Sequence, residues 1–115
     1  MSQFAVAPNS SHSPIAFDSV LDQIIRAMDQ DQFDLLVRAV DLVVLSQVFT
    51  PLGLERAMRI SYDETELVTE LLEAMGVIST PTKRIREHRV LVRIEDLSAV
   101  LFEMYEHRTP TFDAA

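Results

Sequence analysis

The stretch from Leu54 to Ser79 constrains the fold more than any other part of the chain. Apolar residues recur at helical spacing on both sides of a tight turn at 59–62, which predicts two short helices packed on a common core. They are Leu54, Ala57 and Met58 before the turn, and Leu67, Val68, Leu71, Leu72 and Met75 after it. Ser61 and Glu64 form a capping-box pattern, and Gly76 stands where a helix ends in a left-handed conformation. Two short helices, a tight turn and a following strand predict a helix-turn-helix with a wing.

Amphipathic patterns predict further helices around this motif. They cover residues 18–28, 31–48 and 97–107, with caps at Asp18, at Asp31 or Gln32, and at Asp96. Thr50-Pro51 marks the start of the first motif helix, because proline suits the first helical turn. The segment Val40–Val48 is apolar on nearly every side and needs cover on more than one of them. The added helices could supply that cover within one chain, and a symmetric dimer is the simplest alternative.

β-Branched residues after Gly76 predict two short strands, Val77–Ile78 and Arg89–Ile94, paired as a hairpin. The expected fold class is therefore mainly α with a small β-hairpin, a winged helix-turn-helix with added N- and C-terminal helices. We expect one domain over residues 17–108. Residues 1–16 and 109–115 have the composition of loops and are predicted to be flexible tails.

The composition narrows the classes of function. None of the 115 residues is cysteine, which excludes disulfides and cysteine-ligated metal sites. His12, His88 and His107 show no shared metal-ligand spacing, and two glycines cannot form a glycine-rich phosphate loop. We therefore predict no enzyme activity, no metal and no cofactor. The sequence shows no run of about 18 apolar residues and no signal peptide, so we expect a cytoplasmic protein.

The distribution of charge matters more than its total. A net charge of -8 argues against non-specific binding to nucleic acid by the chain as a whole. Four of the ten Lys and Arg residues nevertheless fall within seven positions, at Lys83, Arg84, Arg86 and Arg89. A basic hairpin tip can clamp phosphate. The alternative is a solubilising loop that balances an acidic body.

The segment 56–79 resembles the C-terminal gamma domain of the FtsK/SpoIIIE family of bacterial DNA translocases. The matching residues are Arg56, Arg59-Ile60, Tyr62, Glu70 and Gly76-Val77-Ile78-Ser79, without a gap. Phe33-Asp34 and Val37-Arg38 resemble that domain's first helix, so the likeness covers about residues 31–92. In that family the domain binds a short oriented DNA sequence and steers translocation, with the second motif helix in the major groove. The resemblance implies a double-stranded DNA partner, with Arg56, Arg59 and Tyr62 positioning the motif, although Tyr62 could instead pack on the core.

The second motif helix departs from the family pattern in its charge. The family carries a polar amide and two arginines where this chain has Asp63, Glu64 and Leu67. In addition, Glu66, Glu70 and Glu73 form a carboxylate stripe, which we interpret as a solvated helix face rather than a metal site. Carboxylates repel phosphate, and base recognition depends mostly on arginine, lysine and amide side chains.

Two hypotheses of function follow. The first is a non-enzymatic DNA-binding winged-helix module whose sequence recognition is altered or weakened by its acidic recognition helix. Its DNA contacts would be Arg56, Arg59, Tyr62, Lys83, Arg84, Arg86 and Arg89. The second is a protein-interaction module or DNA-mimicking inhibitor that kept the fold and lost DNA binding. Its basic protein partner would contact Glu66, Glu70 and Glu73, and its added helices would form a homodimer interface. We favour the first, and neither involves a membrane or a small-molecule substrate.

Overall fold

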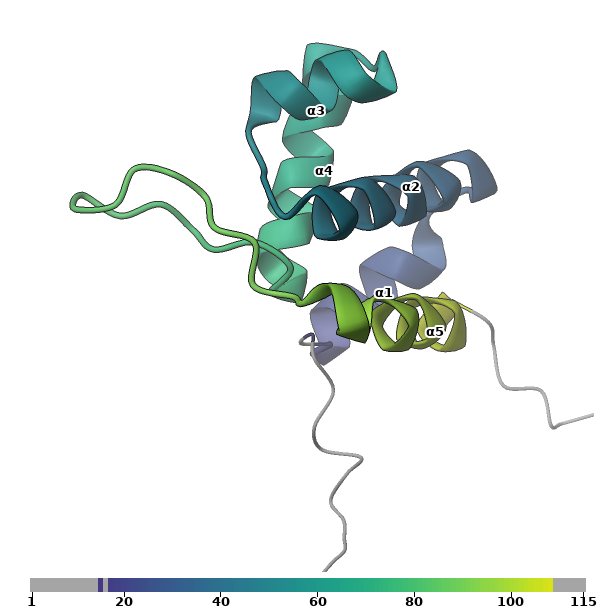
Figure 1. Ribbon diagram of the computed structural model, residues 1–115. Coiled ribbons are helices and arrows are strands. Elements are labelled where there is room, and N and C mark those ends of the chain that lie inside the picture. Colours follow the sequence, from purple (N-terminus) through teal and green to yellow (C-terminus); the bar gives the residue numbers. More distant parts are fainter. Residues whose placement is uncertain (1–14, 16, 109–115) are drawn as a thin grey trace, which may run out of the picture.

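The computed structural model describes residue 15 and residues 17–108 of the chain (Figure 1). This part is mainly α-helical, as predicted. Its helices are α1 (Ser19–Ala27), α2 (Gln30–Ser46), α3 (Pro51–Met58), α4 (Tyr62–Met75) and α5 (Leu97–Arg108), with a short 3-10 helix, η3 (Ile94–Asp96), before α5. Of the two predicted tails, only Ile15 lies among the described residues, and it is buried.

Helix caps set most of these boundaries. The carboxylate of Asp18 accepts a hydrogen bond from the Leu21 N–H at 2.8 Å, which starts α1 where it was predicted. Helix α2 begins earlier than predicted, because Asp29 forms a capping box with Gln32. The Thr50 hydroxyl caps α3, as expected from Thr50-Pro51.

The two helices predicted on either side of the turn at 59–62 form with the predicted local chemistry. The Ser61 hydroxyl accepts from the Glu64 N–H at 3.1 Å, and the Glu64 carboxylate accepts from the Ser61 N–H at 3.0 Å. Arg59 closes α3 in the left-handed region at φ 56°, and Gly76 ends α4 at φ 84°. Only a residue without a Cβ adopts such an angle at no cost, which explains the glycine. Tyr62 is the first residue of α4, rather than part of the turn.

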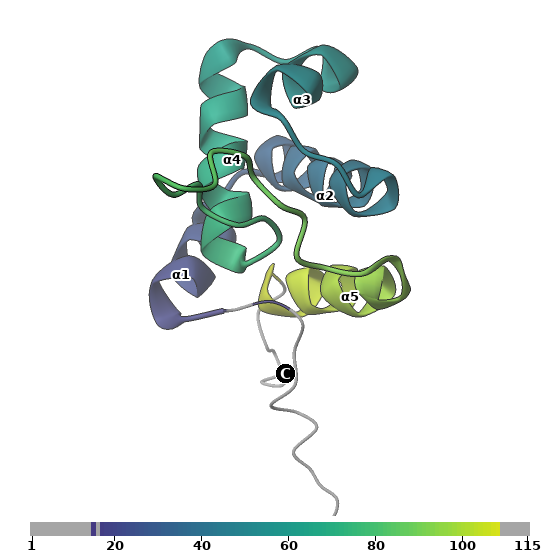
Figure 2. The ribbon, with the colours of Figure 1, turned by 60° about the vertical axis from the view of Figure 1, so that its left-hand side comes forward.

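The core lies where α2 crosses α4 and α5. Helix α3 packs on α4 at one end of the molecule, while α1 and α5 pack on each other at the other end (Figures 1 and 2). The fully buried large side chains come from all of the long helices and from the segment after α4. They include Ile25, Phe33, Leu36, Val40, Val44, Leu72, Met75, Ile78, Val100 and Met104. The predicted N- and C-terminal helices are thus integral to the core.

Polar contacts join α1 to α5. The Arg108 guanidinium donates to the Ile25 carbonyl at 2.9 Å and to the Met28 carbonyl at 2.5 Å, which satisfies the free carbonyls at the end of α1. His107 Nδ1 lies 2.7 Å from an Asp22 carboxylate oxygen. These contacts fix the two added helices against each other within one chain.

The predicted hairpin strands are not formed among the described residues. The two segments instead share one isolated antiparallel bridge, between Ile78 and Val90. Beyond it, Val92 is buried, and its carbonyl accepts a hydrogen bond from the Gln47 side chain at 2.9 Å rather than from a strand. The chain then turns into η3, so the predicted strand to Ile94 is wrong. Asp96 lies inside η3 and does not cap α5.

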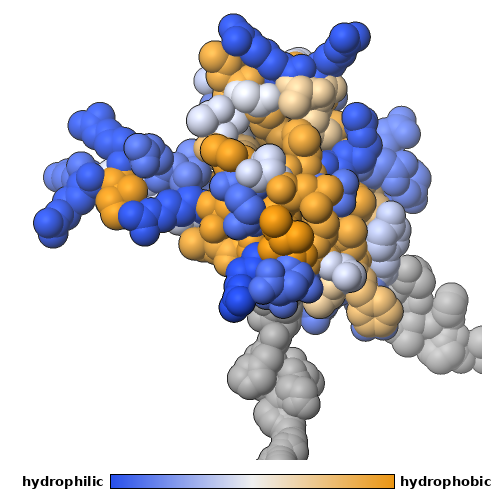
Figure 3. All heavy atoms as spheres, viewed as in Figure 1, coloured by the Kyte–Doolittle hydropathy of each residue, from blue (hydrophilic) through white to orange (hydrophobic). Residues whose placement is uncertain are grey.

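Several apolar side chains are exposed, contrary to the predicted faces. Val40, Val43 and Val44 of α2 are buried, but Leu42, Leu45 and Val48 are 38–66% exposed, so the added helices cover only one side of this segment. Leu67 of α4 is also exposed, and Thr65 takes its place in the core. Its hydroxyl donates to the Ser61 carbonyl at 2.9 Å, which makes its burial tolerable. Figure 3 shows apolar side chains gathered at the centre of the molecular face that is turned to the viewer in Figure 1.

In the described part of the chain, no single helix is long and apolar enough to cross a membrane. Helices α2 and α3 reach that length and composition only when taken together, and they meet at a bend of 118°.

Candidate interface for nucleic acid or protein

The basic residues predicted at the wing lie on a loop, residues 79–90, that projects from the helices (Figures 1 and 2). Its tip is a hydrogen-bonded turn. The Thr82 N–H donates to the Ile85 carbonyl at 2.7 Å, and the Ile85 N–H donates to the Thr82 hydroxyl at 3.0 Å. Lys83, Arg84, Arg86 and Arg89 are all exposed. None of their side chains forms an ion pair with another described residue, so their charges face solvent.

His88 anchors this loop to the helices. Its Nδ1 lies 3.0 Å from the Ser79 carbonyl oxygen and 3.4 Å from a Glu73 carboxylate oxygen. Its ring meets the ring of Phe49, which is buried, edge to face at 5.0 Å. Sequence reasoning missed this role, because a lone histidine in a basic loop carries no signal of its packing. Glu73, predicted as part of the carboxylate stripe, is half-buried here and belongs to the base of the loop.

The other two carboxylates of the stripe line a cleft between α3 and α4. The cleft has a volume of about 370 Å³. It is lined by Pro51, Leu52 and Glu55 of α3 and by Tyr62, Thr65, Glu66, Thr69 and Glu70 of α4. Glu55, Glu66 and Glu70 therefore surround an apolar wall. The Thr69 hydroxyl has no hydrogen-bond partner among the described residues.

Tyr62 stands at one end of this cleft. Its side chain is 65% exposed, so it does not pack on the core. Hydrogen bonding to the Glu66 carboxylate, together with its negative charge, raises the pKa of Tyr62, because ionising the phenol would place a second negative charge beside the first.

Replacing Glu66 with glutamine is expected to lower the pKa of Tyr62 towards the usual value of about 10. The neutral amide removes the repulsion and can donate to the phenolate. An absorbance titration at alkaline pH would measure it in a Tyr105→Phe background, where Tyr62 is the remaining tyrosine. Asp31→Asn, which removes an exposed carboxylate from α2, is the control and should leave the pKa where it is. An unchanged pKa in Glu66→Gln would contradict the assigned contact.

The arginines predicted to position the motif lie apart from the loop. Arg56 and Arg59 are exposed at the end of α3 and in the turn before α4. The loop begins after α4 ends. The 14 residues of α4 span about 21 Å, so Arg59 and the loop stand at opposite ends of this helix. The cleft with Tyr62 lies between them, and the structure does not gather the predicted DNA contacts into one cluster.

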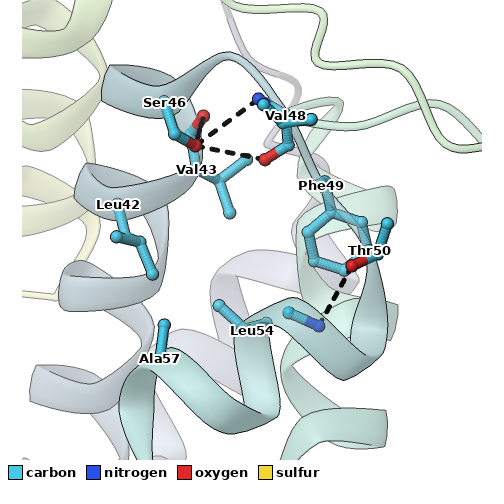
Figure 4. Close-up of a pocket in the computed structure, with 9 residues that line it drawn as sticks. Leu42, Val43, Ser46, Val48, Phe49, Thr50, Leu54 and Ala57 are labelled. Atoms are coloured by element: carbon cyan, nitrogen blue, oxygen red, sulfur yellow. Dashed lines mark hydrogen bonds between the residues drawn. The ribbon is translucent and has the colours of Figure 1, made fainter.

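A second hollow, between α2 and α3, carries no catalytic chemistry. It is lined by Leu42, Val43, Ser46, Val48, Phe49, Thr50, Gly53, Leu54 and Ala57, and none of these side chains is charged (Figure 4). Its volume of about 270 Å³ is below the ~300–1,000 Å³ typical of small-molecule sites. Among the described residues, no group of three His, Cys, Asp or Glu side chains is placed to hold a metal ion.

We compared the chain with known proteins. No protein-family model matches it, and no solved structure matches it. A DNA translocase does. The chain is 35% identical over 72 residues to the DNA translocase FtsK of Corynebacterium efficiens. These residues make up 63% of this chain but only 8% of the translocase. The chain therefore contains a segment similar to a small part of that protein.

Proposed function

We propose that this chain is a non-enzymatic DNA-binding module that resembles the gamma domain of DNA translocases. In this proposal α3 and α4 are the helix-turn-helix, and the loop 79–90 is the wing. The observation that carries it is the projecting loop, whose four exposed cations lack partners among the described residues. A cation of this kind binds phosphate without first breaking an ion pair. The similarity to a DNA translocase supports the same function.

The acidic face of α4 limits what this module can recognise. In the family it resembles, the corresponding helix enters the major groove. Here Asp63, Glu66 and Glu70 are exposed on that helix. Three carboxylates repel the phosphates on either side of the groove. We infer that the loop, with Arg56 and Arg59, supplies most of the affinity, and that sequence recognition is altered or weakened.

Neutralising the loop should remove most DNA binding. We expect Arg84→Ala with Arg86→Ala to weaken binding to random-sequence duplex DNA about 100-fold at about 0.1 M salt, because each of the two lost phosphate contacts is worth roughly one decade there. The dependence of log affinity on log salt should become shallower by about 2 units. Fluorescence anisotropy at two or more salt concentrations would measure both quantities.

The control removes the same charge elsewhere. Arg38 on α2 and Arg93 before η3 are exposed, and Arg93 already pairs with Glu95 at 2.9 Å. Arg38→Ala with Arg93→Ala should therefore weaken binding far less than the loop variant. Equal losses in the two variants would show that only net charge matters. Absence of binding by the wild-type chain even at low salt would overturn the proposed function.

A second function is favoured by the cleft between α3 and α4. Its apolar wall and its carboxylates Glu55, Glu66 and Glu70 have the character of a surface for a basic protein segment. The chain would then be a protein-interaction module or a DNA-mimicking inhibitor. Reversing Glu66 and Glu70 to lysine should abolish binding of such a partner, whereas Arg84→Ala with Arg86→Ala should leave it unchanged.

A further inference from the structure

The loop tip combines charge with an exposed apolar side chain. Ile85 is 40% exposed and lies between Arg84 and Arg86 in sequence. The hydrogen-bonded turn from Thr82 to Ile85 holds this tip in a defined shape. Figure 3 shows the projecting loop as mostly hydrophilic, with apolar surface among the charged groups. An exposed isoleucine contributes nothing to phosphate binding, but burying its side chain in an apolar cleft is favourable.

The cleft between α3 and α4 has the complementary character. Pro51 and Leu52 give it an apolar wall, and Leu52 is 54% exposed. Glu55, Glu66 and Glu70 bring three carboxylates to the same cleft. These are the groups that would pair with arginines on either side of an inserted isoleucine. One chain therefore carries both a basic loop tip and an acidic cleft.

We propose that this chain self-associates by docking the loop tip, residues 82–86, of one copy into the α3–α4 cleft of a second copy. A second copy is the occupant because its loop tip carries positive charge and an apolar side chain, which match the carboxylates and the apolar wall of the cleft. Each copy also supplies one tip and one cleft, so every cleft has a tip to bind. The loop begins at the far end of α4 and points away from the helices (Figure 1), so its tip is presented outward to another molecule. If each loop enters the other copy's cleft, the dimer closes with two-fold symmetry.

This inference does not depend on DNA binding, but it has a consequence for it. A loop held in a cleft cannot also contact phosphate, so duplex DNA and a second copy compete for the same arginines. Self-association would in that case keep the loops covered until DNA displaces them. Both contacts weaken as salt rises, because both are between opposite charges.

The test uses two charge-reversed variants of the full chain. Glu66→Lys with Glu70→Lys gives a basic cleft beside the basic loop, and Arg84→Glu with Arg86→Glu gives an acidic loop beside the acidic cleft. Sedimentation velocity from about 10 µM to about 1 mM at low salt covers the range in which small interfaces associate. We expect wild type to associate and each variant alone to associate at least about tenfold more weakly, because like charges then face each other.

Mixing the two variants is the decisive step. In an equimolar mixture the basic loop of one variant meets the acidic cleft of the other, and the acidic loop meets the basic cleft. We therefore expect the mixture to associate as wild type does. The matched control is Asp34→Lys with Glu106→Lys, which changes the same number of exposed carboxylates on α2 and α5 and should leave self-association as in wild type.

Three results would overturn the proposal. The first is a monomeric wild-type chain over the whole concentration range at low salt. The second is association that survives both charge reversals, which would point to the exposed leucines of α2 instead. The third is a mixture that fails to associate although each variant keeps the helical circular dichroism of wild type. Each of these results is independent of whether wild type binds DNA, so the two proposals fail separately.

Discussion

We expect Phe33→Ala to lower the free energy of unfolding by about 3–5 kcal/mol, the range for removing a fully buried phenylalanine. Phe33 has no exposed surface. Its ring meets the ring of Tyr105 on α5 at 5.2 Å, nearly perpendicular, and the Arg108 guanidinium lies 5.1 Å from its centroid. Arg108 in turn holds the end of α1. The substitution therefore leaves a cavity where α1, α2 and α5 meet.

Urea unfolding followed by far-ultraviolet circular dichroism would measure this loss as a lower midpoint with an unchanged slope. The matched control is Phe102→Ala on α5, which truncates the same side chain where it is 64% exposed. We expect that variant to stay within about 0.5 kcal/mol of wild type. If the two variants lost similar stability, the contacts of Phe33 with α5 would contribute no more than an exposed side chain does. The added helices would then not be part of the cooperative core.

Local chemistry made much of the helical framework predictable. Asp18, Thr50, Ser61 with Glu64, and Gly76 each act as predicted, because a cap needs only residues three or four positions apart. The strand at Arg89–Ile94 failed for the opposite reason. Of its β-branched residues only Val92 is buried, and the hydrogen-bond partner of the Val92 carbonyl is the side chain of Gln47, 45 positions away. No pattern of alternation within the segment carries that information.

In the candidate site, too, the sequence predicts features of single segments but not features that depend on contacts between elements. The exposed cations of the loop and the acidic face of α4 were visible as charge in the sequence. The cleft was not, because it requires Pro51 and Leu52 of α3 to face Glu66 and Glu70 of α4. Likewise, Glu73 leaves the predicted stripe because the fold brings His88 to it. Helical periodicity places a side chain on a face of its own helix, but tertiary packing decides what that face meets.

Reversing two charges on α4 should turn a weak DNA-binding helix into a stronger one. We expect Glu66→Lys with Glu70→Lys to raise the affinity for random-sequence duplex DNA at least about 100-fold at about 0.1 M salt. Two lysines in place of two carboxylates add up to two phosphate contacts, each worth roughly one decade, and they remove the repulsion as well. This result requires α4 to approach the DNA, as the recognition helix of a winged helix would. Fluorescence anisotropy across a salt series would measure the gain and a slope steeper by about 2 units.

The same change of charge placed elsewhere separates position from net charge. Asp34→Lys with Glu106→Lys makes the chain equally less acidic, but on α2 and α5. We expect its gain in affinity to be several-fold at most, because charges outside the contact act only through a screened field. A gain equal to that of the α4 variant would show that α4 does not face the DNA. If neither variant bound more tightly, α4 would be excluded as a recognition helix, and the acidic cleft would be left as a surface for protein alone.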